Sequence, residues 1–169
     1  MDHVKDMSTA YEAYADAIFR FCFFKLSNRE LAKDLTQETF LKTWSYLAGG
    51  GEVKGLKVFL YATANHLIID EYRKKGRQLK VADSLDRLQE SGFDPSFDDT
   101  DSWIDKLDGQ RALELINQLP KLYKDVLFMR YVEDLSLEEI HQLTGESDNT
   151  ISVRIHRGIE KLRKIINNQ

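Results

Sequence analysis

The sequence predicts an all-α protein in which two small helical domains are joined by a flexible acidic linker. Only two of the 169 residues are proline, Pro95 and Pro120, so helices are rarely interrupted. Apolar side chains recur every three or four residues within 1–76 and again within 108–169, which is the helical period. Residues 77–107 hold 4 basic and 8 acidic side chains without a sustained apolar period, which is typical of a linker.

Composition places the chain among ordinary globular proteins. Hydrophobic residues make up 42% and charged residues 31%, which excludes wholesale disorder and fibrous repeats. No run approaches the roughly 18 apolar residues of a membrane span. Met1 to Asp6 lacks the basic-then-apolar order of a secretion signal. The single cysteine, Cys22, cannot form an internal disulfide, which fits a reducing compartment. We therefore expect a soluble cytoplasmic protein with no membrane insertion.

The first domain begins with two predicted helices. The first covers Ser8 to Leu26, where aromatic and alanine side chains recur at helical spacing. Ser27 to Glu30 has the pattern of a capping box, in which the serine oxygen would accept the N–H of the fourth residue. A second helix should start there and run to about Leu47. Gly49 to Gly51 then predicts a loop, because each glycine costs a helix about 1 kcal/mol.

A third helix should begin after Gly55 and end near Arg73 to Lys75. Its predicted inner face carries Leu56, Leu60, Ala64, Leu67 and Ile68. Its outer face mixes aromatic, polar and cationic side chains, namely Lys57, Val58, Tyr61, Asn65, His66, Ile69, Tyr72 and Arg73. Such a face suits single-stranded nucleic acid, because a base stacked on an aromatic ring contributes about 1–3 kcal/mol. Tyr61 and Tyr72 could equally cover the edge of the core, and the sequence leaves both interpretations open.

The second domain is predicted to contain four helices. One covers Asp108 to Gln118 and stops before Pro120, because proline suits the first turn of a helix and disfavours helix before it. The next covers Leu122 to Val132. Ser136 to Glu139 is another capping box, which opens a short helix that Gly145 should end in a left-handed conformation.

The final helix should start at about Thr150. A short helix, a glycine-containing turn and a longer basic helix form the helix-turn-helix signature. From Thr150 onward the chain holds 5 basic side chains and 1 acidic side chain. With its isoleucines buried, the helix would point Ser152, Val153, His156, Arg157 and Glu160 outward, with Arg154 at the margin. We predict that this helix enters the major groove of DNA; the alternative is a helical hairpin with a solvated basic face.

No arrangement of residues in the sequence predicts catalysis. Asp34 and Glu38 share a helix face but have no third ligand, so they indicate a solvated face or a docking surface. The four histidines lack metal-ligand spacing, and neither a phosphate-binding glycine loop nor a nucleophile elbow occurs. Cys22 lies in an aromatic stripe and is expected in the core. We expect no enzyme activity, no catalytic residue, no metal and no cofactor.

The segments Asp34 to Trp44 and Leu56 to Arg73, together with several in the last domain, match one protein family in the same order. The first looks like the polymerase-binding helix of bacterial extracytoplasmic-function sigma factors, and the second is similar to the next helix of their conserved region 2. The segments that resemble their region 4 are Leu119-Pro120, Val126 to Tyr131, Leu135 to Ile140 and Arg154 to Arg157.

The resemblance implies a sigma factor that directs core RNA polymerase to specific promoters and initiates transcription by DNA binding and strand melting. Residues 1–76 would be the region-2 helical bundle, 77–107 the acidic linker and 108–169 the region-4 helix-turn-helix domain. The implied partners are bacterial core RNA polymerase and promoter DNA, with an anti-sigma factor as the usual regulator. The alternative is a stand-alone helix-turn-helix transcriptional regulator, which would need a dimerisation element that the sequence does not offer.

The resemblance also assigns residues to three surfaces. The polymerase-binding residues would be Asp34, Leu35, Gln37, Glu38, Phe40 and Trp44. The −10 element would be read by the loop Ala48 to Lys54 and by Lys57, Tyr61, Asn65, His66, Arg73 and Lys74. The −35 element would be read by Ser152, Val153, Arg154, His156 and Arg157. The family commonly has Arg-Asn at Asn65-His66 and a basic residue then serine at Ser152-Val153, so the promoter sequence does not carry over.

The linker allows two interpretations. In related proteins this segment threads the channel that nascent RNA later occupies, so Asp94, Asp98, Asp99 and Asp101 could mimic RNA phosphates against a basic wall. It could equally be a solvated spacer.

Overall fold

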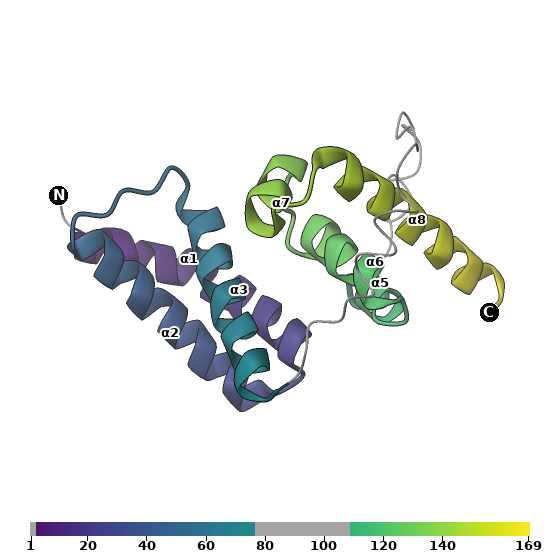
Figure 1. Cartoon of the computed structure of the whole chain (residues 1–169). Helices are drawn as coiled ribbons and strands as arrows, with labels where there is room; N and C mark the ends of the chain where they lie inside the picture. The colour runs from purple at the N-terminus through teal and green to yellow at the C-terminus, as the bar shows by residue number, and fades with distance from the viewer. Residues whose placement is uncertain (1–2, 77–108) are drawn as a thin grey trace. The chain divides into compact units, whose positions relative to one another are not determined.

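The computed structural model describes residues 3–76 and 109–169, which form two compact units, one within Met1–Leu79 and one within Lys80–Gln169 (Figure 1). The described residues are helical and contain no strand, which confirms the predicted all-α class. None of the helices in these two ranges is long and apolar enough to cross a membrane. The predicted linker, residues 77–107, lies outside the described residues, so its boundaries stay a prediction.

The described part of the first unit, residues 3–76, forms three helices around one core. They are α1 (His3–Leu26), α2 (Arg29–Ala48) and α3 (Leu56–Lys74). α1 and α2 pack along each other, and α3 contacts both of them (Figure 1). The core consists of Ala10, Ile18, Phe21 and Cys22 from α1, Ala32, Leu35 and Phe40 from α2, and Leu60, Tyr61, Ala64, Leu67 and Ile68 from α3.

The predicted cap at the start of α2 is wrong by one residue. Asn28 is the N-cap, and its side-chain oxygen accepts the N–H of Leu31 at 3.0 Å. Ser27 has a φ of 53°, whereas an N-cap residue has extended backbone. The chain reverses direction within two residues between α1 and α2, so Ser27 takes the left-handed conformation and Asn28 the cap.

α2 buries a stripe of threonines against the rest of the first unit. The hydroxyls of Thr36, Thr39 and Thr43 donate to the carbonyl oxygens four residues earlier, at 2.6, 2.7 and 2.8 Å. These bonds satisfy hydroxyl groups that would otherwise be costly to bury. The inner side of α2 is therefore partly polar. Three large hydrophobic side chains of α2 are exposed instead, namely Leu41, Trp44 and Tyr46.

Residues 109–169 of the second unit form five helical segments. They are α5 (Gly109–Ile116), α6 (Lys121–Leu127), the π-helical turn η1 (Phe128–Val132), α7 (Leu137–Thr144) and α8 (Asp148–Asn167). α8 packs on α5, α6 and α7. The predicted single helix Leu122–Val132 is thus an α-helix followed by a wider turn, in which the Glu133 N–H donates to the Phe128 carbonyl at 3.0 Å. Asp134, at a φ of 54°, then ends the segment.

The helix-turn-helix forms as its sequence signals predict. Ser136 Oγ accepts the Glu139 N–H at 3.1 Å, and the Ser136 N–H donates to the Glu139 carboxylate at 2.8 Å, which confirms the capping box. Gly145 ends α7 at a φ of 74°. Ser147 then caps α8 by accepting the Thr150 N–H at 3.1 Å, so α8 begins at Asp148, slightly before the expected start.

Candidate functional site

The outer face of α2 combines acidic, amide and large apolar side chains. Leu41 is 61% exposed and Trp44 is 42% exposed, although both are large and apolar. They lie three residues apart and therefore adjoin on one side of the helix. Asp34, Gln37 and Glu38 are exposed on the same side, nearer the start of the helix. An apolar pair beside carboxylates is suited to docking a partner whose surface is apolar and basic.

Two of the predicted polymerase-binding residues, Leu35 and Phe40, are buried in the core of the first unit. Leu35 is 3% exposed and Phe40 is 6% exposed, and the Phe40 ring meets that of Tyr11 on α1 edge-to-face at 4.9 Å. Successive helical residues turn by about 100°, so these two side chains point into the unit while Asp34 and Trp44 point out. Leu41 was missing from the prediction, although its spacing of three residues from Glu38 and Trp44 was a signal for it.

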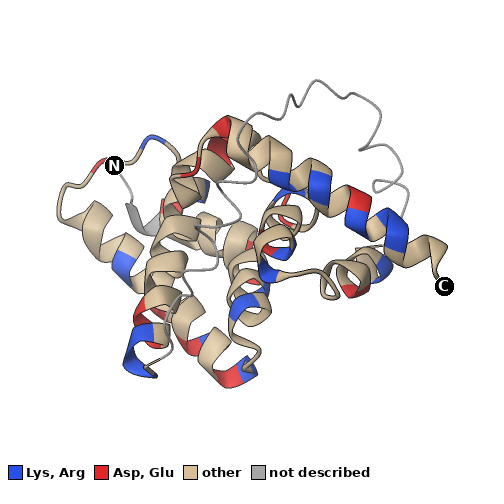
Figure 2. Ribbon diagram, turned by 45° about the vertical axis from the view of Figure 1, so that its right-hand side comes forward, with Lys and Arg blue, Asp and Glu red and all other residues tan. Residues whose placement is uncertain are grey.

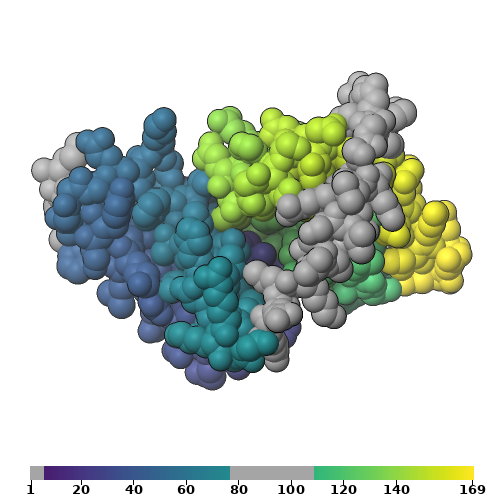
Figure 3. All heavy atoms as spheres, viewed as in Figure 1, coloured from purple at the N-terminus to yellow at the C-terminus, as the bar shows by residue number. Residues whose placement is uncertain are grey.

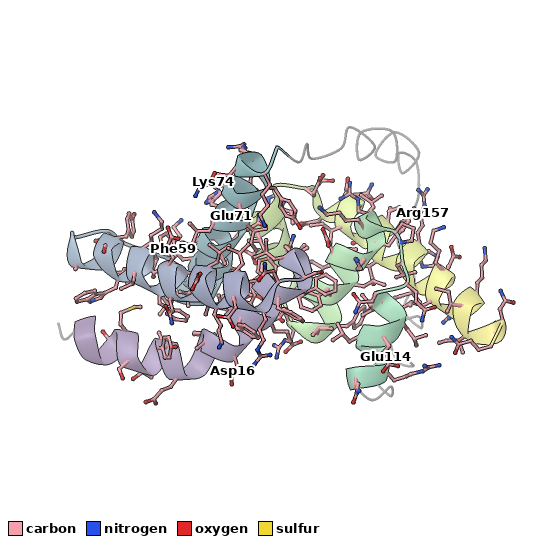
Figure 4. All side chains as sticks on the ribbon, turned by 90° about the horizontal axis from the view of Figure 1, so that it is seen from below. Asp16, Phe59, Glu71, Lys74, Glu114 and Arg157 are labelled. Atoms are coloured by element: carbon pink, nitrogen blue, oxygen red, sulfur yellow. The ribbon has the colours of Figure 1, made fainter. Side chains whose placement is uncertain are left out.

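The outer side of α3 carries the polar and basic side chains predicted there. His66, Arg73 and Lys74 are exposed, and Lys57 and Asn65 are partly exposed. The Arg73 guanidinium lies 3.8 Å from the Asp70 carboxylate. The Lys74 ammonium lies 3.6 Å from the Glu71 carboxylate, and both residues are labelled in Figure 4. Ion pairs this exposed contribute little to folding, so the cations can exchange partners when a phosphate approaches.

The structure distinguishes between the two interpretations that the sequence left open for the tyrosines of α3. Tyr61 is only 2% exposed, and its ring packs edge-to-face on Phe21 at 5.3 Å. It therefore belongs to the core and cannot stack on a base in this structure. The Tyr72 hydroxyl donates to the Lys25 carbonyl oxygen and so ties the end of α3 to that of α1. Core-edge packing is thus the correct interpretation for Tyr61. Of the predicted inner face of α3, Leu60, Ala64, Leu67 and Ile68 are buried and Leu56 is only partly buried, while Tyr61 joins them.

A glycine-rich loop, residues 49–55, connects the end of α2 to the start of α3. It arches away from the helices in the ribbon view and lies at the surface of the first unit in the space-filling view (Figures 1 and 3). Glu52 and Lys54 within it are exposed. The loop therefore lies at the same end of the unit as the start of α3, where Lys57 follows it.

The helix α8 presents several cations outside its buried isoleucine face (Figure 2). Ser152, His156 and Arg157 are partly exposed. His156 Nε2 lies 3.3 Å from a Glu160 carboxylate oxygen one turn later. Side chains in the first turns of such a helix can reach base edges when the helix enters a major groove.

Two residues predicted on this DNA-reading side are buried. Arg154 is 8% exposed, and its guanidinium lies 3.6 Å from the carboxylate of Glu146 in the preceding turn. Its position near Ile151 and Gly158 makes it a brace within the helix-turn-helix rather than a base-reading residue. Val153 is also buried, although the helical period places it on the side of His156 and Arg157. Its predicted role requires that this side chain become accessible when DNA binds.

Metal-ligating and nucleophilic residues do not form a site within the described ranges. No group of three or more His, Cys, Asp or Glu side chains there could hold a metal ion. Cys22 is fully buried, and this burial raises the pKa of its thiol from the ordinary value of 9.0 to about 11. A hydrogen bond with Thr36 and the charge of Lys25 act in the opposite direction but are weaker. The thiol therefore stays protonated near neutral pH.

Comparison with known proteins accounts for both units. The family described as "Sigma-70 region 2" matches residues 10–78, and "Sigma-70, region 4" matches residues 109–162. Among curated relatives, the ECF RNA polymerase sigma factor SigW of Bacillus subtilis is 28% identical over 166 residues, covering 90% of this chain and 84% of SigW. The B. subtilis RNA polymerase sigma factor YlaC is 28% identical, covering 97% of this chain and 94% of YlaC.

A solved structure shares the fold. The sigma factor RpoE of Bartonella quintana, crystallised with the anti-sigma factor NepR, matches with a TM-score of 0.67 at 20% identity. The match covers 96% of this chain and 98% of RpoE.

A three-helix unit with an exposed acidic and apolar helix face, followed by a helix-turn-helix unit whose last helix is basic, defines a promoter-reading transcription factor, and this chain belongs to the sigma-70 family. Within that family it is an extracytoplasmic-function sigma factor, which acts in promoter-directed transcription initiation. Membership is consistent with the expectation that the chain is not an enzyme.

Proposed function

We propose that the outer face of α2 is the surface through which this sigma factor binds core RNA polymerase. The observation that carries the proposal is the exposure of Leu41 and Trp44 beside Asp34, Gln37 and Glu38. Covering a Leu side chain alone contributes about 1.5–3 kcal/mol relative to leaving it in water, and tryptophan is a frequent anchor of protein interfaces. The carboxylates would steer the approach of a basic partner and set the orientation of the complex.

The two DNA-reading surfaces are proposed with fewer residues than the sequence suggested. On the −10 side, the loop Ala48 to Lys54 would read the melted strand. The residues that would hold its phosphates or contact its bases are Lys57, Asn65, His66, Arg73 and Lys74. On the −35 side, Ser152, His156 and Arg157 of α8 would face the major groove, where Arg157 can contact a guanine through two hydrogen bonds. Tyr61, Leu35, Phe40 and Arg154 support these surfaces from within the units.

We propose that the protein acts in the cytoplasm with core polymerase and promoter DNA and catalyses no reaction of its own. An anti-sigma factor is its proposed regulator, because the RpoE protein of the same fold was crystallised with one. Such a regulator would act by covering one or more of the three surfaces.

The test of the polymerase surface compares two apolar side chains of similar exposure. Trp44→Ala should weaken binding of the full chain to purified core RNA polymerase at least about tenfold, which is a common loss for an anchor residue. Phe23→Ala is the matched control, because Phe23 is 44% exposed but lies on α1. Equal effects of the two substitutions, or none from Trp44→Ala, would contradict the proposal.

A further inference from the structure

One aromatic side chain, Tyr46 near the end of α2, holds the loop that connects α2 to α3. Its ring stacks on that of Phe59 in the first turn of α3, with the ring centroids 5.1 Å apart and the planes at 26°. Its hydroxyl donates to the Glu52 carbonyl oxygen at 3.4 Å. Tyr46 therefore connects the helix before the loop, the loop itself and the helix after it.

Gly51 lies directly against the Tyr46 ring. A Cβ atom at Gly51 would lie 2.3 Å from Cε1 of that ring and 2.5 Å from Cδ1 and Cζ, closer than atoms can approach. The Gly51 N–H also donates to the Tyr46 carbonyl at 2.9 Å, so the backbone is tied close to the helix end. Gly50, in contrast, has a φ of 89° and open space around its Cβ position. Glycine is thus needed at Gly50 for conformation and at Gly51 for room.

A loop with three successive glycines would sample many conformations without such a clamp. Base discrimination requires loop atoms at hydrogen-bonding distance from one base and not from another. A loop that samples many conformations would therefore bind a strand without selecting its sequence. Ordering the loop before DNA arrives also removes part of the entropic cost of binding. Although Tyr46 is 47% exposed, its ring contacts both Gly51 in the loop and Phe59 in α3. These contacts fix the loop against the two helices rather than fill the core of the unit.

We propose that Tyr46 is a positioning residue for base-specific reading of the −10 strand. Its ring packs against Gly51 and thereby holds the loop in place. The proposal rests on the −10 function proposed for this loop. The ring contacts carry the effect, because a hydroxyl bond of 3.4 Å is weak. Tyr46 acts through the loop and is not itself the base-reading group.

The experiment uses the full chain assembled with core RNA polymerase and a promoter library randomised across the −10 element. Sequencing the DNA that the complex retains gives the base preference at each position. A wild-type complex without any −10 preference would reject the function proposed for the loop, whatever Tyr46 does. If the wild-type complex does show a −10 base preference, the variants test only the role of Tyr46.

Gly51→Ala and Tyr46→Ala should each reduce the preference at one or two adjacent −10 positions by about tenfold, which is a typical effect of losing one base contact. Preferences at the −35 element and binding to core polymerase should stay unchanged. The double variant Tyr46→Ala/Gly51→Ala should be no worse than Tyr46→Ala, because the added Cβ then has room. Tyr46→Phe should keep the wild-type preference.

Gly55→Ala is the control in the same loop, because its Cβ would meet nothing within 4 Å and its φ is −150°. It should keep the wild-type preference. An unchanged −10 preference in Gly51→Ala, or additive losses in the double variant, would overturn the proposal. A loss in Tyr46→Phe as large as in Tyr46→Ala would also overturn it, since the ring contacts would then not be the cause. Circular dichroism shows whether each variant is folded before it is assayed.

Discussion

Gly158 lies where α8 crosses α6, and the absence of a side chain there sets how closely the two helices pack. A Cβ at this position would lie 2.9 Å from Leu127 Cδ1 and 3.3 Å from Tyr123 Cβ. Leu127 is fully buried, so its side chain cannot swing into solvent to make room. The same glycine would weaken an isolated helix by about 1 kcal/mol relative to alanine, so its presence reflects packing rather than helix propensity.

Gly158→Ala should therefore destabilise the second unit, by about 1–3 kcal/mol for overpacking less the gain in helix propensity. Hydrogen exchange of the α8 amides in the full chain measures the effect in the unit concerned. Gly109→Ala is the control, because its Cβ meets nothing within 4 Å. Slower exchange in Gly158→Ala than in the wild type would contradict the packing argument.

Cys22 provides a test of burial through its chemistry. Burial raises the pKa of its thiol to about 11, so between the ordinary value of 9.0 and that value the folded chain holds a proton that the unfolded chain loses. Stability should accordingly fall as pH rises through this window. Cys22→Ala should flatten that part of the curve of unfolding free energy against pH. Identical slopes in the two proteins between pH 9.0 and about 11 would exclude the effect.

At the scale of elements, α8 has two arginines one turn apart with different environments. Arg154 is buried and paired with Glu146, whereas Arg157 is partly exposed on the proposed DNA side. Removing one partner of a buried ion pair costs about 3–5 kcal/mol, and an arginine that contacts a base contributes about 1–3 kcal/mol of discrimination. The side chains of Arg154 and Glu146 are 10% and 15% exposed, so we expect removal of one partner to cost about 3 kcal/mol.

Arg154→Gln should increase hydrogen exchange in α7 and α8 and weaken promoter binding equally for all −35 sequences. Arg157→Gln should leave exchange unchanged and relax the preference at one −35 base pair. Both outcomes are measured with polymerase-bound protein, by exchange mass spectrometry and by selection from a library randomised at the −35 element. A relaxed base preference in Arg154→Gln with unchanged exchange would reassign that residue to DNA reading.

At the scale of the whole molecule, charge and reach indicate that the two units need a scaffold. The chain has a net charge of −4, so it gains little of the phosphate attraction that supplies most non-specific DNA affinity. A linker of the predicted length could reach roughly 100 Å when fully stretched. The same chain would span only about 30 Å as a flexible coil. Polymerase is the proposed element that sets the spacing of the two DNA-reading surfaces.

The free protein should therefore bind promoter DNA weakly and with strong salt dependence, and specific binding should appear when core polymerase is added. Fluorescence anisotropy of labelled promoter DNA at several salt concentrations, with and without core polymerase, measures both. Tight and salt-resistant binding by the chain alone would contradict the shared-scaffold mechanism. The aspartates of the linker, Asp94, Asp98, Asp99 and Asp101, lie outside the described residues, and their proposed RNA-mimicking role stays a prediction.

Local signals predicted most of the fold because they act over three or four residues. The capping box at Ser136, the left-handed Gly145 and the isoleucine spacing of α8 all depend on neighbouring backbone groups, and the structure reproduces each of them. Ser27 fails for a related reason. Its neighbour Asn28 is an equally good cap, and the tightness of the turn decided between them.

Surface assignment was less predictable than helix assignment. A motif match gives the order of residues but not the side of the helix on which each side chain lies. Leu35 and Phe40 were therefore placed on the partner surface together with Trp44. The structure separates them, because Tyr11 on a different helix covers Phe40. Tyr61 was likewise placed outside, although the packing of Phe21 against it brings this side of α3 into the core.

The sequence by itself determined the helical class, the positions of most helix ends and the sigma-factor motifs, since backbone propensity, capping and spacing are local properties. Only the tertiary structure decided that Leu35, Phe40 and Tyr61, which the motifs had placed on partner surfaces, are buried. It also showed that Arg154 braces Glu146 and that Tyr46 holds Gly51 in the loop. Those outcomes depend on side chains brought together from different elements, and their mutual distances are not fixed until the helices pack.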